Sequence, residues 1–196
     1  MLIDHLVYAA PDLDTAVAGI EARFGVRAAG GGQHLGQGTH NRLLALGPRT
    51  YLEIVAPDPR QPEPASPRPY GVDGVREPGL VGWALQTDDI ERVADLGGVI
   101  DGQRLTVDGQ LLRWRLTANA LTAGVVPFFI SWGDTPSPAL SAPAGLTLES
   151  VRVEHPDPRG FAGRLRELGA DVDVRTGPAP ALVATISGPN GRHDLR

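Results

Sequence analysis

His5 and Glu53 are the first residues whose types and positions suggest chemistry. Glu53 lies inside the apolar run TYLEIVAP, where a carboxylate is costly unless it faces a polar cavity, a cationic partner or a metal. If both runs are strands, alternation places Leu6 and Leu52 on one face and His5 and Glu53 on the other. An imidazole and a carboxylate on neighbouring strands form a partial ligand set for a divalent metal, and Glu53 is also a candidate general base. His40, in GTHN, becomes a third ligand if its ring turns inward.

Arg113 and Arg115 offer a second way to tolerate the acid. In QLLRWRLT they alternate with apolar residues, so both project from one face of the expected strand. If that face meets the cavity, the guanidinium groups pair with Glu53 or hold a carboxylate or phosphate through bidentate contacts. A solvated sheet face is the competing interpretation. The further candidates for substrate contacts are Phe129, Ser131 and Trp83.

The remaining histidines and the glycine-rich segment carry weaker signals. His34, in a glycine-rich loop, and His193 are expected to be solvated, whereas His155 precedes a proline at a helix entry and is expected to be structural. GGG at 30–32 does not follow a strand and open a helix, so no nucleotide is expected to bind there. Ser131 has no obvious histidine partner and GxSxG is absent, which argues against a hydrolase.

Three similar segments must position these residues. The first reads as a strand over 2–9, a helix that begins after the N-cap Asp12 and ends at Gly25, a short strand with a loop over 26–37, and strands near 40–46 and 50–56. The second has the strand LVGWALQT, the short helix DDIERVADLGG and the strands QLLRWRLT and VVPFFISWG. The third has LTLESVRVEHPD, the helix PRGFAGRLRELG and strands near 171–175 and 180–187. The apolar stripe of the first helix is Leu13, Ala16, Val17, Ile20 and Phe24.

These segments predict an α+β fold of repeated βαβββ modules that form a curved mixed-sheet cup with the helices outside. We expect a first module at 1–57, a Pro-rich linker at 58–79, a second module at 80–134, and a Pro/Ala linker with a third βα-type repeat packing on the same core at 135–196. Seven prolines from Pro57 to Pro78 define the linker. Strand edges of such cups can pair, so the pattern is compatible with a homodimer.

Composition excludes several classes of function. The chain of 196 residues has no cysteine, so it has no disulfide, thiolate nucleophile or cysteine-bound zinc. All 18 basic residues are arginine, which excludes a Schiff-base lysine. A net charge of −5 with scattered basic residues argues against nucleic-acid binding. Because we find neither a long apolar run nor the pattern of a secretory signal, we expect no membrane span and a cytoplasmic location.

The order of these segments resembles the glyoxalase-like branch of the vicinal oxygen chelate superfamily, which also contains bleomycin-resistance proteins and dioxygenases. The resemblance rests on IDHLVYAAPDLDTA, GTHNRLLALGPRTYLEIVAPDP, LLRWRLT and VVPFFISWGD and covers most of residues 2–134. It implies paired modules and a divalent metal at His5 and Glu53, with zinc, iron, manganese and nickel not distinguished. The matching positions of the second module hold Trp83 and Ser131, which are poor ligands.

Two functions therefore remain open. The resemblance implies an enzyme of lyase, isomerase or dioxygenase type that acts on a small oxygen-rich metabolite, anionic where Arg113 and Arg115 reach it. In that enzyme the metal polarises a substrate oxygen or Glu53 acts as the base. The alternative is a non-catalytic small-molecule binding module that has lost the metal, which Trp83 and Ser131 favour. An interaction scaffold built on the Pro-rich segment has only composition in its support.

Overall fold

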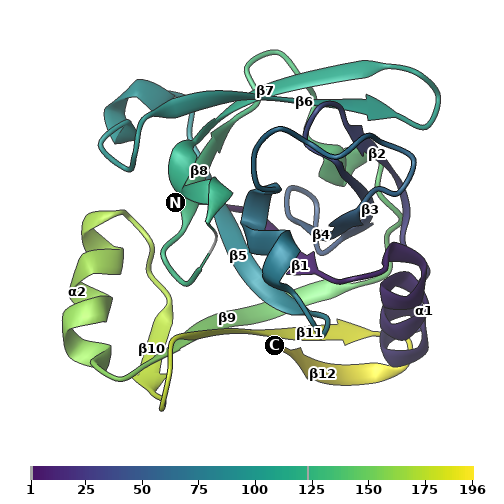
Figure 1. Ribbon diagram of the computed structural model, residues 1–196. Helices are drawn as coiled ribbons and strands as arrows, with labels where there is room; N and C mark the ends of the chain where they lie inside the picture. The colour runs from purple at the N-terminus through teal and green to yellow at the C-terminus, as the bar shows by residue number, and fades with distance from the viewer. Residues whose placement is uncertain (1, 123) are drawn as a thin grey trace.

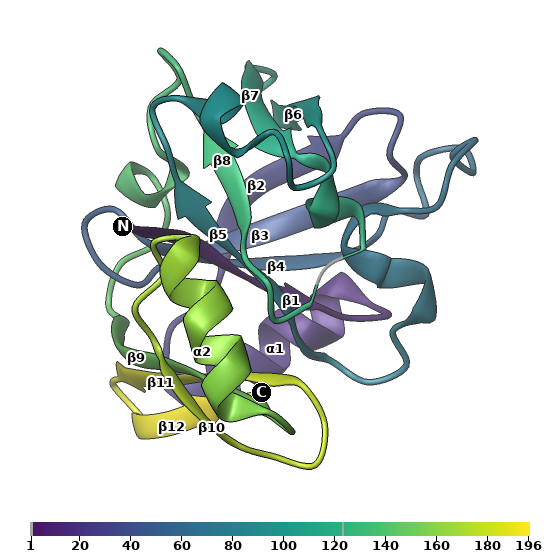
Figure 2. The same cartoon turned by 90° about the vertical axis from the view of Figure 1, so that its left-hand side faces the viewer.

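The computed structural model describes residues 2–122 and 124–196, and within them the protein is mostly sheet. Eight strands close into a barrel, and four further strands form a second sheet beside it (Figures 1 and 2). The barrel strands are β1 (Ile3–Ala9), β2 (Ala29–His34), β3 (Thr39–Ala45), β4 (Tyr51–Pro57), β5 (Gly79–Gln86), β6 (Val99–Thr106), β7 (Leu111–Thr117) and β8 (Phe128–Ser131). The second sheet contains β9 (Thr147–His155), β10 (Asp173–Thr176), β11 (Ala181–Gly188) and β12 (Gly191–Leu195).

The barrel strands follow the order β1-β4-β3-β2-β6-β7-β8-β5. β1 pairs in parallel with β4, and β5 pairs in parallel with β8, whereas the other neighbours are antiparallel. The expected curved mixed sheet is therefore present, but it closes on itself instead of leaving an open cup. The two halves of the barrel meet where β2 pairs with β6 and where β1 pairs with β5.

Helix α1 (Leu13–Phe24) begins and ends where the sequence predicts. The Asp12 carboxylate accepts a hydrogen bond from the Thr15 amide at 2.8 Å, which satisfies one of the free N–H groups of the first turn. Gly25 adopts a left-handed conformation with φ 82° and closes the helix through its N–H to the Glu21 carbonyl. The predicted apolar stripe is buried along its whole length.

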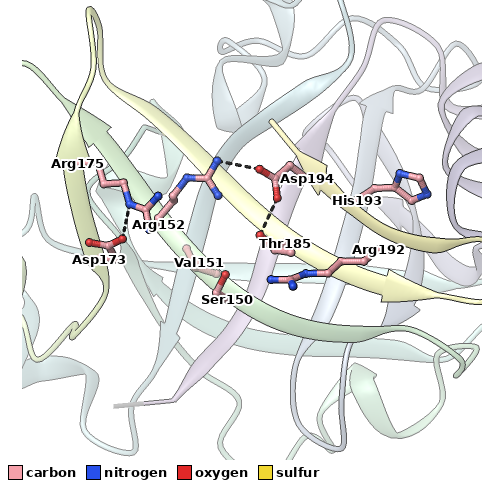
Figure 3. Close-up of a pocket in the computed structure, with 9 residues that line it drawn as sticks. All are labelled: Ser150, Val151, Arg152, Asp173, Arg175, Thr185, Arg192, His193 and Asp194. Carbon is pink, nitrogen blue, oxygen red and sulfur yellow. Dashed lines mark hydrogen bonds and ion pairs between the residues drawn. The ribbon is translucent and has the colours of Figure 1, made fainter.

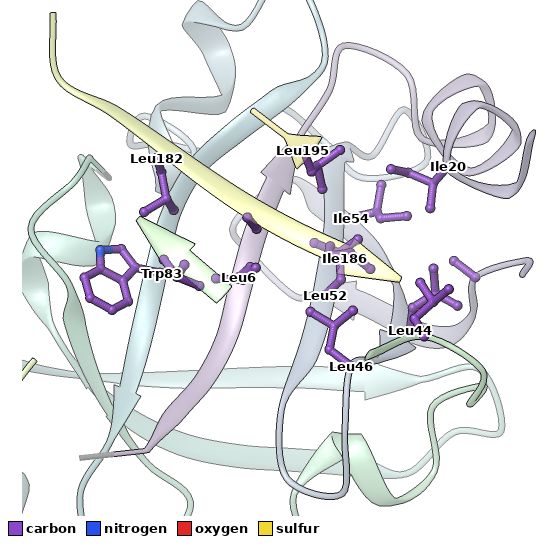
Figure 4. Packing of buried hydrophobic residues seen from close by; sticks show 14 of the residues in the cluster. Leu6, Ile20, Leu44, Leu46, Leu52, Ile54, Trp83, Leu182, Ile186 and Leu195 are labelled. Atoms are coloured by element: carbon purple, nitrogen blue, oxygen red, sulfur yellow. The ribbon is translucent and has the colours of Figure 1, made fainter. Parts of the chain in front are cut away.

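An outer core joins the barrel, α1 and the second sheet (Figure 4). Leu6, Leu52 and Ile54 point out of the barrel into this core, where Leu182 and Ile186 of the second sheet meet them. Helix α2 (Pro158–Glu167) contributes its buried face to the same core. None of the helices in the described residues is long and apolar enough to cross a membrane.

An interior core fills the barrel, and part of it comes from the segment expected to be a linker. The 3₁₀ helix η1 (Pro69–Gly74) places Tyr70 and Val72 among the interior side chains. Tyr70 has φ 61° and is the one non-glycine residue with a positive φ among the described residues. Such a backbone is strained for a tyrosine and persists only where the surrounding structure imposes it.

Short 3₁₀ turns replace part of the expected helix content. The segment DDIERVADLGG forms the 3₁₀ helix η2 (Ile90–Val93) and not an α-helix. Two further turns, η3 (Ala118–Leu121) and η4 (Pro138–Leu140), lie in the connections before and after β8.

Candidate functional site

A small chamber inside the barrel collects polar side chains from five strands. Its volume is about 10 Å³, which is the room that one water molecule needs. His5 and Glu53 both line it, as strand alternation predicts, since Leu6 and Leu52 face the outer core. The residues that line the chamber are His5, His34, Asn41, Tyr51, Glu53, Tyr70, Arg104, Trp114, Ile130 and Trp132.

Asp4 sets the proton position on His5. The Nδ1 atom of His5 lies 2.7 Å from Asp4 Oδ1, and the Trp132 indole N–H donates to Asp4 Oδ2 at 3.0 Å. A carboxylate accepts, so Nδ1 carries the hydrogen and Nε2 keeps its lone pair. The lone pair faces Glu53 Oε2 at 3.6 Å, which is too long for a hydrogen bond, and Nε2 is buried without a partner. The ring also stacks on Tyr51 with a centroid distance of 4.7 Å.

Strict alternation hides Asp4 from sequence analysis, because it would turn the residue before His5 out of the chamber. The pairing of β1 with β5 shifts register between Ile3 and His5. A bulge of this kind changes the direction of nearby side chains. It accounts for a buried Asp4 that reaches both His5 and Trp132.

Asn41 connects Glu53 with His34. The Gly32 amide donates to Asn41 Oδ1 at 2.9 Å, so Nδ2 must point the other way, where it donates to Glu53 Oε1 at 2.6 Å. Nδ2 also lies 3.3 Å from His34 Nε2, which is then the acceptor nitrogen, and His34 Nδ1 lies 2.9 Å from the Thr39 hydroxyl. Burial lowers the pKa of His34 to about 4. His34 is therefore neutral at pH 7, and the expectation that it is solvated is wrong, because it is the inward-facing end of β2.

Arg104 is the cation of the chamber, and sequence analysis did not single it out. It is 4 % exposed and extends inward from β6, with Nη1 3.5 Å from Asn41 Oδ1. Its Nε atom is buried and has no hydrogen-bond partner. The alternation of β6 carries the signal in retrospect, because Gly102 and Arg104 are its buried positions.

Arg113 and Arg115 do not reach the chamber. On β7 the inward side is the apolar one, with Trp114 facing the chamber and Leu116 in the interior core. Arg115 lies on the outer side and forms an ion pair with Glu91 at 2.8 Å. The expectation that these two arginines pair with Glu53 is therefore wrong, because the apolar face of the strand fills the barrel and leaves the charged face to solvent.

Three other candidates also lie away from the chamber. Trp83 is opposite Leu6 in the strand pairing, packs in the outer core and donates its indole N–H to the Val125 carbonyl at 2.9 Å. Phe129 lies in the same core, and its neighbour Phe128 faces inward and meets His5 edge-on at 5.4 Å. Ser131 pairs with Arg115 on the outer side.

His40 turns outward, because its neighbour Asn41 is the inward residue of β3. Its Nδ1 atom lies 3.8 Å from Asp58 Oδ1 and 3.4 Å from Arg60 Nη2. Burial lowers the pKa of His40, and the charge of Asp58 opposes that effect. The structure therefore does not bring His40 to His5 and Glu53, and a metal site built from all three is not formed.

The donor set of the chamber does not fit a resident divalent metal. Only His5 Nε2 and Glu53 Oε2 are free to coordinate, since Asn41 occupies the His34 lone pair and the other Glu53 oxygen. Metal sites in proteins usually have three or four protein ligands. The guanidinium of Arg104 already places a positive charge in the same chamber. No group of three or more His, Asp or Glu residues suited to a metal occurs in the part of the chain that the structure describes.

Two tyrosines complete the chamber wall. Burial, together with the charges of Asp4 and Glu53, raises the pKa of Tyr51 well above its ordinary value, and burial raises the pKa of Tyr70 in the same way. Both phenols therefore keep their protons at neutral pH. They are available as hydrogen-bond donors to an oxygen atom in the chamber.

Trp114 and Trp132 separate the chamber from a groove on the outside of the barrel. The ring centroids of the two indoles lie 5.3 Å apart, and both residues line the chamber and the groove. The groove has a volume of about 810 Å³ and includes Ser131, Arg113 and Arg115. The expected substrate-contact residues from β7 and the end of β8 thus lie at this groove and not at His5.

A further hollow, of about 610 Å³, lies on the outer face of the second sheet (Figure 3). Two of its three arginines have acidic partners: Arg152 contacts Asp194 at 2.8 Å, and Arg175 contacts Asp173 at 2.6 Å. Figure 3 shows that Arg152 of β9 reaches across the sheet to Asp194 of β12, whereas Arg175 and Asp173 lie on the same strand. The hollow shares no residue with the chamber.

Comparison with known proteins agrees with the resemblance in sequence. The model of the glyoxalase-like domain family matches residues 3–169. A methylmalonyl-CoA epimerase of Streptomyces coelicolor, in complex with 2-nitronate-propionyl-CoA, is similar with 17% identity and a TM-score of 0.47 over 70% of this chain and 99% of that chain. The methylmalonyl-CoA epimerase of Mycobacterium tuberculosis is similar with 20% identity and a TM-score of 0.44 over 71% of this chain and 90% of that chain.

At these identities and TM-scores the likeness does not extend to substrate or reaction. No curated relative matches the sequence significantly. The family match covers most of the chain, from β1 to the end of α2. The chain therefore belongs to the glyoxalase-like domain family.

Proposed function

We propose that this protein is an enzyme of isomerase type that moves a proton on a small, oxygen-rich molecule, with His5 as the general base. The observation that carries the proposal is the His5 Nε2 atom, which is buried, unpartnered and directed toward Glu53 Oε2 at 3.6 Å. Its lone pair is available because Asp4 holds the hydrogen on the other ring nitrogen. A base held in one tautomer at the wall of a chamber has the geometry that proton abstraction requires.

The charges around His5 favour its protonated form during a reaction. Asp4 is hydrogen-bonded to Nδ1, and Glu53 faces Nε2, so both carboxylates stabilise an imidazolium. With Arg104 as the other cation, a proton on His5 balances two carboxylates with two positive groups. In this proposal Glu53 stabilises the charge on protonated His5, and His5, not Glu53, is the general base.

Arg104 and the phenols serve the oxygen that gains negative charge when a neighbouring C–H bond is broken. The Arg104 Nε–H group is a free donor, and Tyr51 and Tyr70 keep their protons because their pKa values are raised. In many enzymes, fixed hydrogen-bond donors that point at a developing oxyanion make the largest single contribution to the rate enhancement. A metal is not part of this proposal, because only two donors are free for it.

A deuterium-exchange experiment tests the proposal without knowledge of the natural substrate. The protein is incubated in D₂O with a panel of small α-hydroxy carbonyl compounds and 2-substituted acids, and the loss of the C–H signal next to the carbonyl is followed by proton NMR. We expect exchange with at least one compound, a large loss of exchange in His5→Gln, and unchanged exchange in His40→Gln, which alters an outward-facing histidine on β3 of the same barrel. Exchange that survives intact in His5→Gln contradicts the proposal.

The size of the chamber favours a second candidate, a binding module without catalysis. At about 10 Å³ the closed chamber holds no metabolite beyond a single small group. A binding module predicts saturable binding of panel compounds with no exchange of carbon-bound hydrogen. The same NMR samples distinguish the two candidates, since binding shifts the ligand signals and exchange removes them.

A further inference from the structure

Two buried side-chain atoms without a hydrogen-bond partner stand out, and both belong to residues of the chamber. They are His5 Nε2 and Arg104 Nε, and the described residues contain no others. Buried polar groups in folded proteins are almost always satisfied, so an unsatisfied pair around one small space points to an occupant. Asn41 and the Oε1 atom of Glu53 already have hydrogen-bond partners, whereas Glu53 Oε2 has only the contact of 3.6 Å with His5 Nε2.

The two atoms have opposite hydrogen-bonding roles. Arg104 Nε–H can only donate, whereas His5 Nε2 can only accept, because the His5 hydrogen is on Nδ1 and is donated to Asp4. An occupant that satisfies both must accept one hydrogen bond and donate another. A carboxylate accepts but has no hydrogen to give, and an ammonium group donates but does not accept. A hydroxyl group does both.

We infer that the chamber is a subsite for one hydroxyl group of the substrate, which accepts from Arg104 Nε–H and donates to His5 Nε2. This inference rests on the proposed function and names the chemical class of its substrate, a small molecule with a hydroxyl group next to the reacting carbon. The hydroxyl oxygen faces the guanidinium of Arg104, and the hydroxyl group keeps its hydrogen, so that His5 Nε2 remains the base for the adjacent C–H bond.

Charge and size favour a hydroxyl group over an anion. Asp4 and Glu53 contribute two carboxylates around His5, and Arg104 contributes one guanidinium, so a carboxylate occupant adds a third negative group to a buried space. The volume of about 10 Å³ accommodates a group of the size of one water molecule. This argument concerns the occupant of the chamber, whereas Arg113 and Arg115 line the groove outside it.

The rest of the substrate has room on the far side of the tryptophan pair. Trp132 is held by its hydrogen bond to Asp4, whereas Trp114 lies over Gly102, where a methyl group in place of the glycine hydrogen would collide with the indole. Beyond them lies the groove of about 810 Å³. A hydroxyl group reaches the chamber from this groove when Trp114 turns aside.

Three probes of similar size test the subsite in the full-length wild-type protein: hydroxyacetone, acetone and acetate. The protein is labelled with ¹⁵N-histidine, and the Nε2 resonance of His5 is followed during titration with each probe. We expect a saturable shift with hydroxyacetone and binding at least about tenfold weaker for acetone and acetate, as the loss of a hydrogen bond to a charged group predicts. Acetate or acetone that binds as tightly as hydroxyacetone overturns the inference, as does the absence of a saturable shift.

Variants locate the effect at Arg104. Arg104→Met keeps an unbranched side chain of similar length without donors, and we expect it to weaken hydroxyacetone binding by about tenfold. Arg27→Met, which alters an exposed arginine outside both the chamber and the groove, is the matched control and should bind hydroxyacetone as the wild type does. The comparison of the three probes on wild-type protein decides the inference even if Arg104→Met does not fold.

The subsite and the proposed enzyme can fail separately. Selective binding of hydroxyacetone with no deuterium exchange in any compound refutes the isomerase and leaves the hydroxyl subsite in place. Deuterium exchange in compounds without a hydroxyl group, with no selective shift of His5 by hydroxyacetone, refutes the subsite and leaves the isomerase in place.

Discussion

Replacing Asp4 by asparagine tests how the site controls its base. The Asp4 carboxylate accepts from His5 Nδ1 at 2.7 Å and from the Trp132 indole at 3.0 Å. In Asp4→Asn the amide oxygen accepts only from Trp132, and the amide nitrogen donates to His5 Nδ1. The hydrogen of His5 then moves to Nε2, and the lone pair that faces the chamber disappears. In a well-studied serine protease the same aspartate-to-asparagine change lowers kcat by about 10⁴-fold. We expect a loss of exchange activity of about 10³- to 10⁴-fold here.

The stability effect of Asp4→Asn follows from the same two contacts. A hydrogen bond to a charged group contributes about 1.5–3 kcal/mol and a neutral one about 0.5–1.5 kcal/mol, so the change costs about 1 kcal/mol per bond, or about 2 kcal/mol in total. For a domain of this size that lowers Tm by about 4–8 °C.

Three measurements check this prediction. ¹⁵N NMR of the His5 ring identifies the nitrogen that carries the hydrogen, calorimetry measures Tm, and deuterium exchange measures activity. Asp171→Asn, at an exposed position before β10 that lines neither the chamber nor the groove, is the control and should leave all three unchanged. If His5 keeps its hydrogen on Nδ1 in Asp4→Asn while the exchange activity falls, control of the tautomer is not the reason for the loss.

Four further predictions concern stability and access. Burial lowers the pKa of His34 to about 4 in the folded protein. In the unfolded chain the His34 imidazole binds a proton near pH 6.5, whereas in the folded protein it does so only near pH 4. The free energy of unfolding measured in urea should therefore fall by about 3 kcal/mol between pH 7 and pH 4 in the wild type, and His34→Gln should remove this fall. If the free energy of unfolding of His34→Gln depends on pH as that of the wild type does, His34 is not the group responsible. Asn41→Asp replaces the donor that lies 2.6 Å from Glu53 Oε1 with a second carboxylate, so urea unfolding at pH 7 should show a loss of about 3–5 kcal/mol that shrinks as the pH falls. Leu52→Ala removes a fully buried side chain of the outer core, and calorimetry should register a cost of about 2–5 kcal/mol. Trp114→Ala joins the chamber to the groove, so diethyl pyrocarbonate should modify His5 faster than in the wild type, and an equal rate shows that Trp114 does not close the chamber.

Local sequence rules predict the first half of the site well. The spacing of apolar residues and the caps at Asp12 and Gly25 locate α1 correctly, and the stripe of α1 identifies the side of the sheet that it covers. With that side assigned, a period of two is enough to place His5 and Glu53 in one hollow. These features depend on neighbours close in the chain, which is why the sequence alone carries them.

The other half of the site depends on pairing between distant strands. Arg104 lies near Asn41 because β6 pairs with β2 and β2 pairs with β3. No pattern of neighbouring residues in the sequence predicts these strand pairings. Arg113 and Arg115 show the same difficulty in reverse, since alternation places them on one face of β7 but does not say which face turns into the barrel. Phe128 and Phe129 are consecutive in β8, and this one-residue difference places Phe128 in the interior core and Phe129 in the outer core.

Tyr70 is beyond any rule of composition or periodicity. Prolines and glycines around it indicate a linker, and a linker residue is ordinarily exposed. Instead, the chain turns at Tyr70 and Gly71 with positive φ values of 61° and 63°, and the tyrosine ring enters the barrel near Phe128. An L-residue other than glycine resists that backbone, so packing of the ring within the barrel must compensate for the strain. Tyr70 lines the same chamber as the unpartnered atoms His5 Nε2 and Arg104 Nε. Strained backbone of this kind is concentrated at functional sites.

The buried acid in TYLEIVAP has its explanation in this convergence. Glu53 receives one strong hydrogen bond from Asn41, two imidazoles approach its oxygens at 3.5 and 3.6 Å, and Arg104 shares its chamber. Each of these groups comes from a different strand, so the desolvation of the carboxylate is offset only after the barrel has closed. Because Asn41 holds one oxygen of Glu53, the other remains free to face His5. The arrangement that makes the charge tolerable is therefore also the one that leaves His5 Nε2 with a carboxylate in front of it and no bond to it.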